Sequence, residues 1–189
     1  MQTQAIIKYI YQWMQNYAKT AKSKGFVVGV SGGIDSAVTS TLAAKTGFPV
    51  MCVEMPIHQV ADQVSRAQEH INWLKKNYSN VNSVDVELTT IFDSFINAVP
   101  AVEDSENRLR SLVNTRARLR MTTLYYFAQL HNFLVAGTGN KVEDFGIGFY
   151  TKYGDGGVDL SPIADLMKTE VFAIGKTLGV CQNILDANP

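Results

Sequence analysis

The chain has 189 residues with 17 basic and 17 acidic side chains, so no overall field attracts it to nucleic acid or to an anionic membrane. Hydrophobic residues make up 46% of the chain, which allows a substantial core, and no apolar run approaches the roughly 18 residues of a membrane span. The two cysteines, Cys52 and Cys181, lie far apart without metal or redox spacing, and the N-terminus lacks the features of a signal peptide. We therefore expect one cytoplasmic domain over residues 1–189 that contacts neither nucleic acid nor membrane.

Helices and strands alternate along the chain. Apolar residues at helical spacing predict the helices, and short β-branched runs between glycines and prolines predict buried strands. The expected elements, in chain order, are a helix over 5–22, a strand over 26–30, a helix over 36–45, a strand over 50–53, a helix over 61–77, a strand over 84–88, helices over 91–98 and 105–131, a strand over 133–137 and a helix over 168–178.

This alternation predicts a Rossmann-like α/β fold, a three-layer α/β/α arrangement around an open, mainly parallel sheet. Ligands of such sheets bind at the carboxyl ends of the strands. Two glycine-containing turns follow strands here, at Gly32-Gly33 and at Gly137-Thr138-Gly139. We expect both turns to open on the same edge of the sheet.

The most informative segment joins the first strand to the second helix. Its residues are Gly29, Val30, Ser31, Gly32, Gly33, Ile34, Asp35 and Ser36. Glycines let consecutive amides turn inward as a nest for anions, and a helix N-terminus adds free N–H groups. The segment lacks the lysine of a P-loop and the three spaced glycines of a dinucleotide fingerprint. A plain turn, with Asp35 or Ser36 capping the helix, remains the alternative.

The Ser-Gly-Gly-x-Asp-Ser string resembles the pyrophosphate-binding loop of the N-type ATP pyrophosphatases, in the adenine nucleotide alpha hydrolase-like superfamily. These enzymes cleave ATP to AMP and pyrophosphate while activating a carbonyl oxygen as an adenylate. Three further segments, Ala117–Met121, Gly137–Glu143 and Phe149–Asp159, resemble the NAD synthetase family in order and spacing. The resemblance implies a C–N ligase that uses ATP, Mg²⁺ and ammonia to amidate deamido-NAD, giving NAD, AMP and pyrophosphate.

The resemblance also implies roles for single residues. The Gly29–Ser36 segment, Thr138 and Lys168 would contact ATP, and Asp35 and Glu143 would hold Mg²⁺. The residues implied for deamido-NAD are Arg118, Lys152 and Asp159, and those implied for catalysis are Asp155, near the ammonia, and Lys168. Simpler interpretations remain for three of them: a turn hydroxyl for Thr138, a surface acid for Glu143 and a helix-start lysine for Lys168.

Other charged residues have structural explanations. Arg108 and Arg110 are expected to pair with acids near the start of the long helix, and the helix over 105–131 is implied as a homodimer interface. His58, His70 and His131 show no metal-ligand spacing, so we expect surface or loop histidines.

The chain also departs from the family. Members normally continue past Asn188-Pro189 with a segment that covers both substrates, so the chain is either a fragment or a shortened protein. The turn after Glu143 is one residue longer than in the family. The chain begins within about 25 residues of the phosphate segment, so we expect no attached glutaminase domain and free ammonia as the nitrogen donor, unless a separate subunit delivers it. Two alternatives stay open: an ATP pyrophosphatase that amidates another acid, and a catalytically silent nucleotide-binding module.

Overall fold

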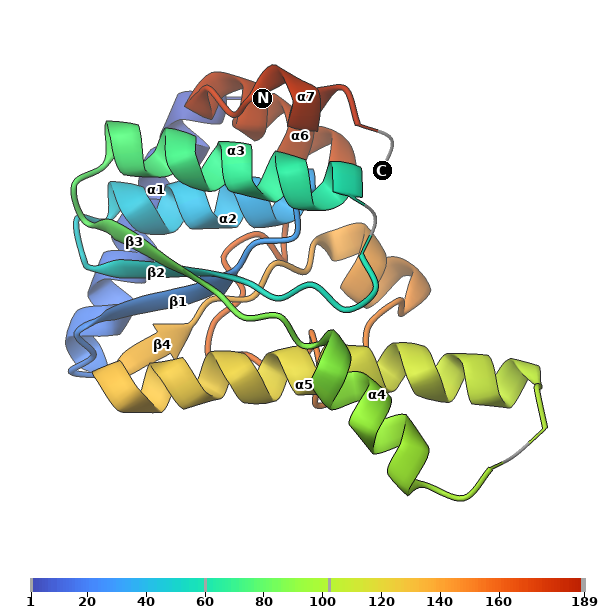
Figure 1. Cartoon of the computed structure of the whole chain (residues 1–189). Helices are drawn as coiled ribbons and strands as arrows, with labels where there is room; N and C mark the ends of the chain where they lie inside the picture. The colour runs from blue at the N-terminus through green and yellow to red at the C-terminus, as the bar shows by residue number, and fades with distance from the viewer. Residues whose placement is uncertain (1, 60, 102, 188–189) are drawn as a thin grey trace.

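The computed structural model of the protein describes residues 2–59, 61–101 and 103–187 (Figure 1). The end of the chain, Asn188-Pro189, lies outside the described residues. The elements are α1 (Thr3–Thr20), β1 (Gly25–Gly29), α2 (Ile34–Lys45), β2 (Val50–Glu54), α3 (Ala61–Asn77), β3 (Val81–Asp85), α4 (Thr89–Ala98), α5 (Glu106–His131), β4 (Phe133–Val135), the π-helix η1 (Val142–Ile147), α6 (Lys168–Leu178) and α7 (Gln182–Leu185).

The four strands form one parallel sheet in the order β3-β2-β1-β4. The two central strands are nearly free of charge: β1 reads Gly-Phe-Val-Val-Gly, and β2 carries only Glu54, at its end. Strands of this composition are stable only when both faces are covered. The predicted α/β fold with a parallel sheet is confirmed.

Helices cover both faces of the sheet. Figure 1 shows α1, α2, α3, α6 and α7 on one side and α4 and α5 on the other. A hydrophobic core lies on each face of the sheet, and alternate residues of β1 belong to different cores. Phe26 and Val28 pack under α2, while Val27 packs toward α5. The helix α2 is buried almost all round, from Ser36 to Ala44. The three predicted layers are therefore present.

Three local predictions need correction. The third strand runs over Val81–Asp85 rather than 84–88, because its polar residues Asn82 and Ser83 are tolerated on an edge strand and obscured its start. The segment after Lys141, expected to be a glycine-rich connection, contains η1, and a short helix α7 follows Cys181. A π-helical turn holds one residue more than an α-helical turn would, and the turn length relative to the family stays a prediction.

His70 also departs from expectation. It was expected on the surface or in a loop, yet it lies on α3 with no exposed area, stacked on Trp73 at 5.7 Å between ring centroids. Its Nε2 lies 3.0 Å from the Ser40 hydroxyl on α2, and its Nδ1 has no partner among the described residues. Burial lowers the pKa of His70 from 6.5 to about 4.

This shift predicts acid sensitivity of the fold. Because the unfolded histidine binds a proton below pH 6.5 and the folded one does not, the stability from His70 is complete above pH 6.5 and declines toward pH 4. Between pH 7 and pH 5 the loss should reach about 2 kcal/mol. Urea unfolding at both values checks this. His70→Phe should remove that part of the loss, whereas His131→Gln, on the exposed end of α5, should keep it; equal acid sensitivity in both variants would contradict the assignment.

None of the helices in the described ranges combines the length and apolarity needed to cross a bilayer.

Candidate functional site

The turn after β1 is built to present main-chain N–H groups. Gly32 has φ +79°, in the left-handed region, and Gly33 is the extended N-cap of α2. The first helical hydrogen bond runs from Ala37 N to Gly33 O. Within the described part of the chain, no acceptor takes the N–H groups of Ile34, Asp35 and Ser36. Three such donors at a helix N-terminus form a site for an anion such as a phosphate.

Serine hydroxyls hold this turn in shape. Ser31 N donates to Ser36 Oγ at 3.2 Å, and Ser36 Oγ donates to Gly33 O at 3.0 Å. The helix α3 packs directly on the turn, where Arg66 Nε donates to Gly32 O at 3.3 Å. A β-carbon on Gly32 would lie 2.5 Å from Gln63 O. The turn therefore keeps its form without a ligand, and only glycine fits at position 32.

A charged cluster lies beside this helix N-terminus. Lys168 Nζ, at the start of α6, bonds Asp35 Oδ2 at 2.5 Å and Glu143 Oε1 at 2.9 Å. The fully buried Asn140 donates from Nδ2 to Asp35 Oδ1 at 3.1 Å, and its Oδ1 accepts from the N–H groups of Val142 and Glu143. These contacts join the loops after β1 and β4, so the prediction that both turns open on one edge is confirmed.

Electrostatics keep Lys168 charged. Desolvation alone would lower the pKa of Lys168, but the hydrogen bonds and charges of Asp35 and Glu143 raise it above its ordinary value. The Lys168 ammonium touches both carboxylates, so their oxygens lie within reach of one cation. Two carboxylates placed in this way, with phosphate oxygens completing the shell, suit Mg²⁺, so the donor set fits the metal that the sequence predicted. Asp35, Glu143 and Lys168 are brought together as expected.

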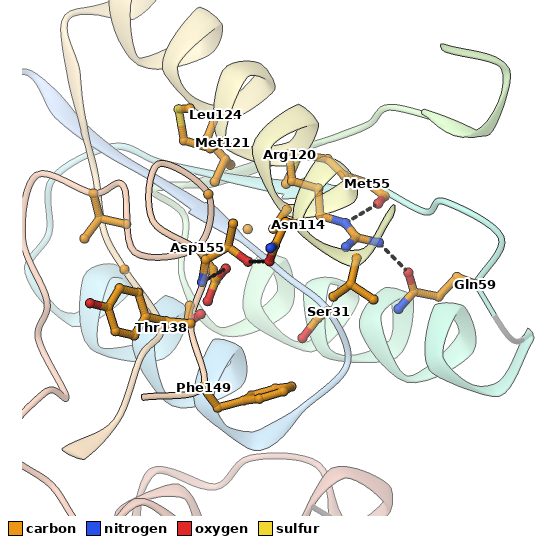
Figure 2. Close-up of a pocket in the computed structure, with 18 of the residues that line it drawn as sticks. Ser31, Met55, Gln59, Asn114, Arg120, Met121, Leu124, Thr138, Phe149 and Asp155 are labelled. Carbon is orange, nitrogen blue, oxygen red and sulfur yellow. Dashed lines mark hydrogen bonds between the residues drawn. The ribbon is translucent and has the colours of Figure 1, made fainter. Parts of the chain in front are cut away.

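A cavity of 1090 Å³ opens next to the turn. It runs from the ends of β1 and β2, past α5, to the loop over 147–158, and Figure 2 shows side chains from α5 and from this loop around it. Gly29, Val30 and Ser31 line it, as does Thr138. Its volume lies just above the range of about 300–1,000 Å³ that is typical of small-ligand pockets. Predicted nucleotide residues thus line a cavity large enough for a nucleotide.

Asp155 and Arg120 also line the cavity. Asp155 Oδ1 accepts from Thr151 N at 3.0 Å, which fixes the carboxylate in the loop. Arg120 donates to Met55 O and to Gln59 Oε1, both at 3.0 Å (Figure 2). Desolvation and Arg116 lower the pKa of Arg120, and Asp155 partly opposes them. The cavity therefore offers both a carboxylate and a guanidinium.

The three residues implied for deamido-NAD do not line the cavity. Arg118 and Lys152 are exposed and adjacent, since Arg118 Nε donates to Lys152 O at 3.3 Å. Asp159 is anchored inside the protein instead: Oδ2 accepts from Val135 N at 2.8 Å, and Oδ1 accepts from Tyr125 OH at 3.0 Å. A structural role for Asp159 is thus evident, and the ligand role of these three residues stays a prediction.

Other residues of the site were missed from sequence. Asn140 links the Asp35 carboxylate to the main chain of Glu143, and Asp144 lies so close to Gly139 that a β-carbon there would meet its carboxylate at 2.0 Å. Burial, with Asp155, Glu143 and Asp35 nearby, raises the pKa of Asp144. Asn140 directly follows the turn Gly137-Thr138-Gly139, and this position could have indicated that it belongs to the site. Elsewhere, the expected ion pairs of Arg108 with Asp104 and of Arg110 with Glu106 are confirmed.

An open parallel sheet with a nest of amides after its first strand, paired carboxylates and an adjoining cavity defines a nucleotide-binding α/β protein. The chain belongs to the NAD synthase family, whose pattern matches residues 6–189.

Individual relatives agree with this membership. The NH(3)-dependent NAD(+) synthetase of Mesoplasma florum is 39% identical over 191 residues, covering 100% of this chain and 75% of that protein. The structure of an NMN synthetase from Francisella tularensis superposes with a TM-score of 0.92 at 34% identity, covering 100% of this chain and 76% of that one. An NH3-dependent NAD synthetase from Campylobacter jejuni, in complex with the nitrate ion, gives 0.86 at 33% identity, covering 98% and 77%.

Proposed function

We propose that the protein is an ammonia-dependent NAD synthetase, which uses ATP to amidate the nicotinate carboxylate of deamido-NAD. The observation that carries this is the turn at Gly32-Gly33, with its free N–H groups next to paired carboxylates and a nucleotide-sized cavity. The carboxylate of deamido-NAD attacks the α-phosphorus of ATP, pyrophosphate leaves, and ammonia then displaces AMP from the mixed anhydride. The products are NAD, AMP and pyrophosphate.

Each part of the site has a task in this proposal. The N–H groups of Ile34, Asp35 and Ser36 stabilise the negative charge that grows on the departing pyrophosphate, without having to reorient. Lys168 stabilises the same charge, and Thr138 orients ATP from the turn after β4. Asp35 and Glu143 would hold Mg²⁺, which neutralises phosphate oxygens when bound. Asp155 lines the cavity, where it orients ammonium and assists the removal of a proton from the ammonium.

The dinucleotide would bind partly outside the cavity. Arg118 and Lys152 form an exposed basic pair that suits its phosphates. Apolar side chains on α5 are also exposed, among them Tyr126 at 64% and Leu130 at 61%. An exposed apolar helix face supports the proposed homodimer. We further propose a single domain over 1–189 and a cytoplasmic location, supported by the free thiols of Cys52 and Cys181.

A second candidate is amidation of the mononucleotide, nicotinate mononucleotide, in place of the dinucleotide. It is favoured by the similarity to the Francisella tularensis NMN synthetase, which covers the whole chain. The chemistry at the carboxylate is the same for both acids. The two candidates differ only in whether an adenylate half of the acid substrate is bound.

One assay separates the candidates. The protein is mixed with ATP, Mg²⁺ and ammonium, and AMP and amidated product are measured with deamido-NAD, with nicotinate mononucleotide and with neither. We expect AMP that depends on deamido-NAD, in a one-to-one ratio with NAD. Preference for the mononucleotide supports the second candidate. ATP binding without acid-dependent AMP would contradict both and support a silent nucleotide-binding module.

A further inference from the structure

Glu54 ends the strand β2 and is the one acidic residue that is buried among the described residues, with 4% of its surface exposed. It lies beside the exit of β1, because Val30 N donates to Val53 O at 2.9 Å. Glu54 lines the cavity together with Ser31. A buried carboxylate thus stands one strand away from the phosphate turn.

The carboxylate has one fixed oxygen and one available oxygen. Gln68 Nε2 donates to Glu54 Oε2 and also to Asp85 Oδ1, the latter at 3.0 Å. Oε1 receives no hydrogen bond from any residue in the described ranges, and it is not among the fully enclosed unpartnered atoms. Burial raises the pKa of Glu54, the bond from Gln68 opposes this, and Asp85 raises it further. An acid in such a place is costly unless donors meet it.

We propose that Glu54 is a specificity-determining residue that accepts hydrogen bonds from the ribose hydroxyls of the bound nucleotide. The inference rests on the phosphate site of the proposed function. A ribose is only a few bonds from its α-phosphate, and adjacent strands lie about 4.8 Å apart. A nucleotide with its phosphates at the end of β1 therefore places its sugar near the end of β2.

Two features favour the sugar over the base. In the dinucleotide-binding doubly wound folds, whose three-glycine fingerprint this chain lacks, an acid about 20 residues beyond the glycine turn binds ribose hydroxyls, and the position of Glu54 is analogous. Here the strand order has β2 next to β1, and Glu54 follows Gly32 by 22 residues. An ionised carboxylate only accepts hydrogen bonds, so it matches both hydroxyls of a ribose, whereas adenine offers it only the N6 amino group as a donor and otherwise presents acceptor nitrogens.

The test is equilibrium binding by calorimetry, which does not depend on turnover. Wild-type protein should bind ATP about 10- to 100-fold more tightly than 2′-deoxy-ATP or 3′-deoxy-ATP, the range expected for a hydrogen bond to a charged group. In Glu54→Ala, the preference for ATP over each deoxy analogue should disappear, because no ribose hydroxyl then has this carboxylate as its acceptor. Asp85→Asn is the matched control: it shares the Gln68 contact but lies outside the cavity lining, and it should keep the wild-type ratio.

Other outcomes would overturn the proposal. One is that Glu54→Ala keeps the wild-type preference for ATP over the deoxy analogues. The other is that Glu54→Ala keeps this preference but loses a preference for ATP over inosine triphosphate, which would place the carboxylate at the base. Circular dichroism monitors folding. If Glu54→Ala does not fold, Glu54→Gln, which keeps the shape of the side chain, replaces it. Glu54→Gln should lose part of the preference for ATP over the deoxy analogues. Ribose selectivity without acid-dependent AMP would refute the proposed reaction and leave this inference standing. No ATP binding at all would overturn it together with the phosphate site.

Discussion

Replacing Asp35 by asparagine is expected to lower the rate of AMP formation by about 1,000-fold, equivalent to about 4 kcal/mol of transition-state stabilisation. The new amide would keep the shape of the side chain and its neighbour Asn140, but not the charge that Lys168 and Mg²⁺ need. Lys168 would still bond Glu143, so the free energy of unfolding should change by no more than about 2 kcal/mol. Single-turnover AMP release and urea unfolding measure the two effects.

The matched control for Asp35 is Asp62→Asn, the same change in the first turn of α3, where the acid is exposed and outside the cavity lining. It should leave turnover within about twofold of wild type, since an exposed acid of this kind contributes little. A folded Asp35→Asn protein with unaltered turnover would refute the assignment of Asp35 as a metal ligand.

The second large effect is expected at Gly32. In Gly32→Ala, the left-handed φ of +79° would cost about 1–2 kcal/mol, and the new β-carbon would press on Gln63 O and on Ala67 N. The turn and the start of α3 must then shift apart. We expect a loss of at least about 2 kcal/mol in stability and ATP binding weakened by about 100-fold or more.

Gly33→Ala isolates the steric effect at position 32. Gly33 has φ −96°, and a β-carbon there would meet only the Ser31 hydroxyl, at an ordinary contact distance of 3.5 Å. Its stability should stay within about 1 kcal/mol of wild type. Thermal and urea unfolding of both variants provide the comparison. Equal destabilisation by the two alanines would show that the packing of α3 on the turn does not determine its form.

Much of the fold was predictable because local pattern and global packing agree. Uncharged β-branched runs indicated β1, β2 and β4, and the apolar residues of α1 and α3 recur at regular helical spacing. The prediction failed where neither signal holds. β3 carries the polar residues Asn82 and Ser83 directly after Val81, which an edge strand tolerates, and η1 is a π-helix whose hydrogen bonding no simple periodicity reveals. His70 was misplaced because a polar residue on an amphipathic helix gives no sign that α2 covers it.

The site was predictable in part for a similar reason. The glycine turn and the acids Asp35 and Glu143 are adjacent to strand ends, so chain order alone brings them together. Contacts between distant segments could not be foreseen. Lys168 bridges two acids from separate loops, Asp159 is held by Val135 and Tyr125, and Glu54 accepts a hydrogen bond from Gln68. Such pairings depend on how the helices pack, which a single sequence does not specify.

In the proposed reaction, the amides at the mouth of β1 hold the pyrophosphate of ATP as it leaves. A crystal structure of the protein grown with ATP, Mg²⁺ and deamido-NAD tests it most directly. We predict pyrophosphate or the β- and γ-phosphates against the N–H groups of Ile34, Asp35 and Ser36, with the adenosine in the adjoining cavity. Nucleotide bound elsewhere, with this turn empty, would contradict the account.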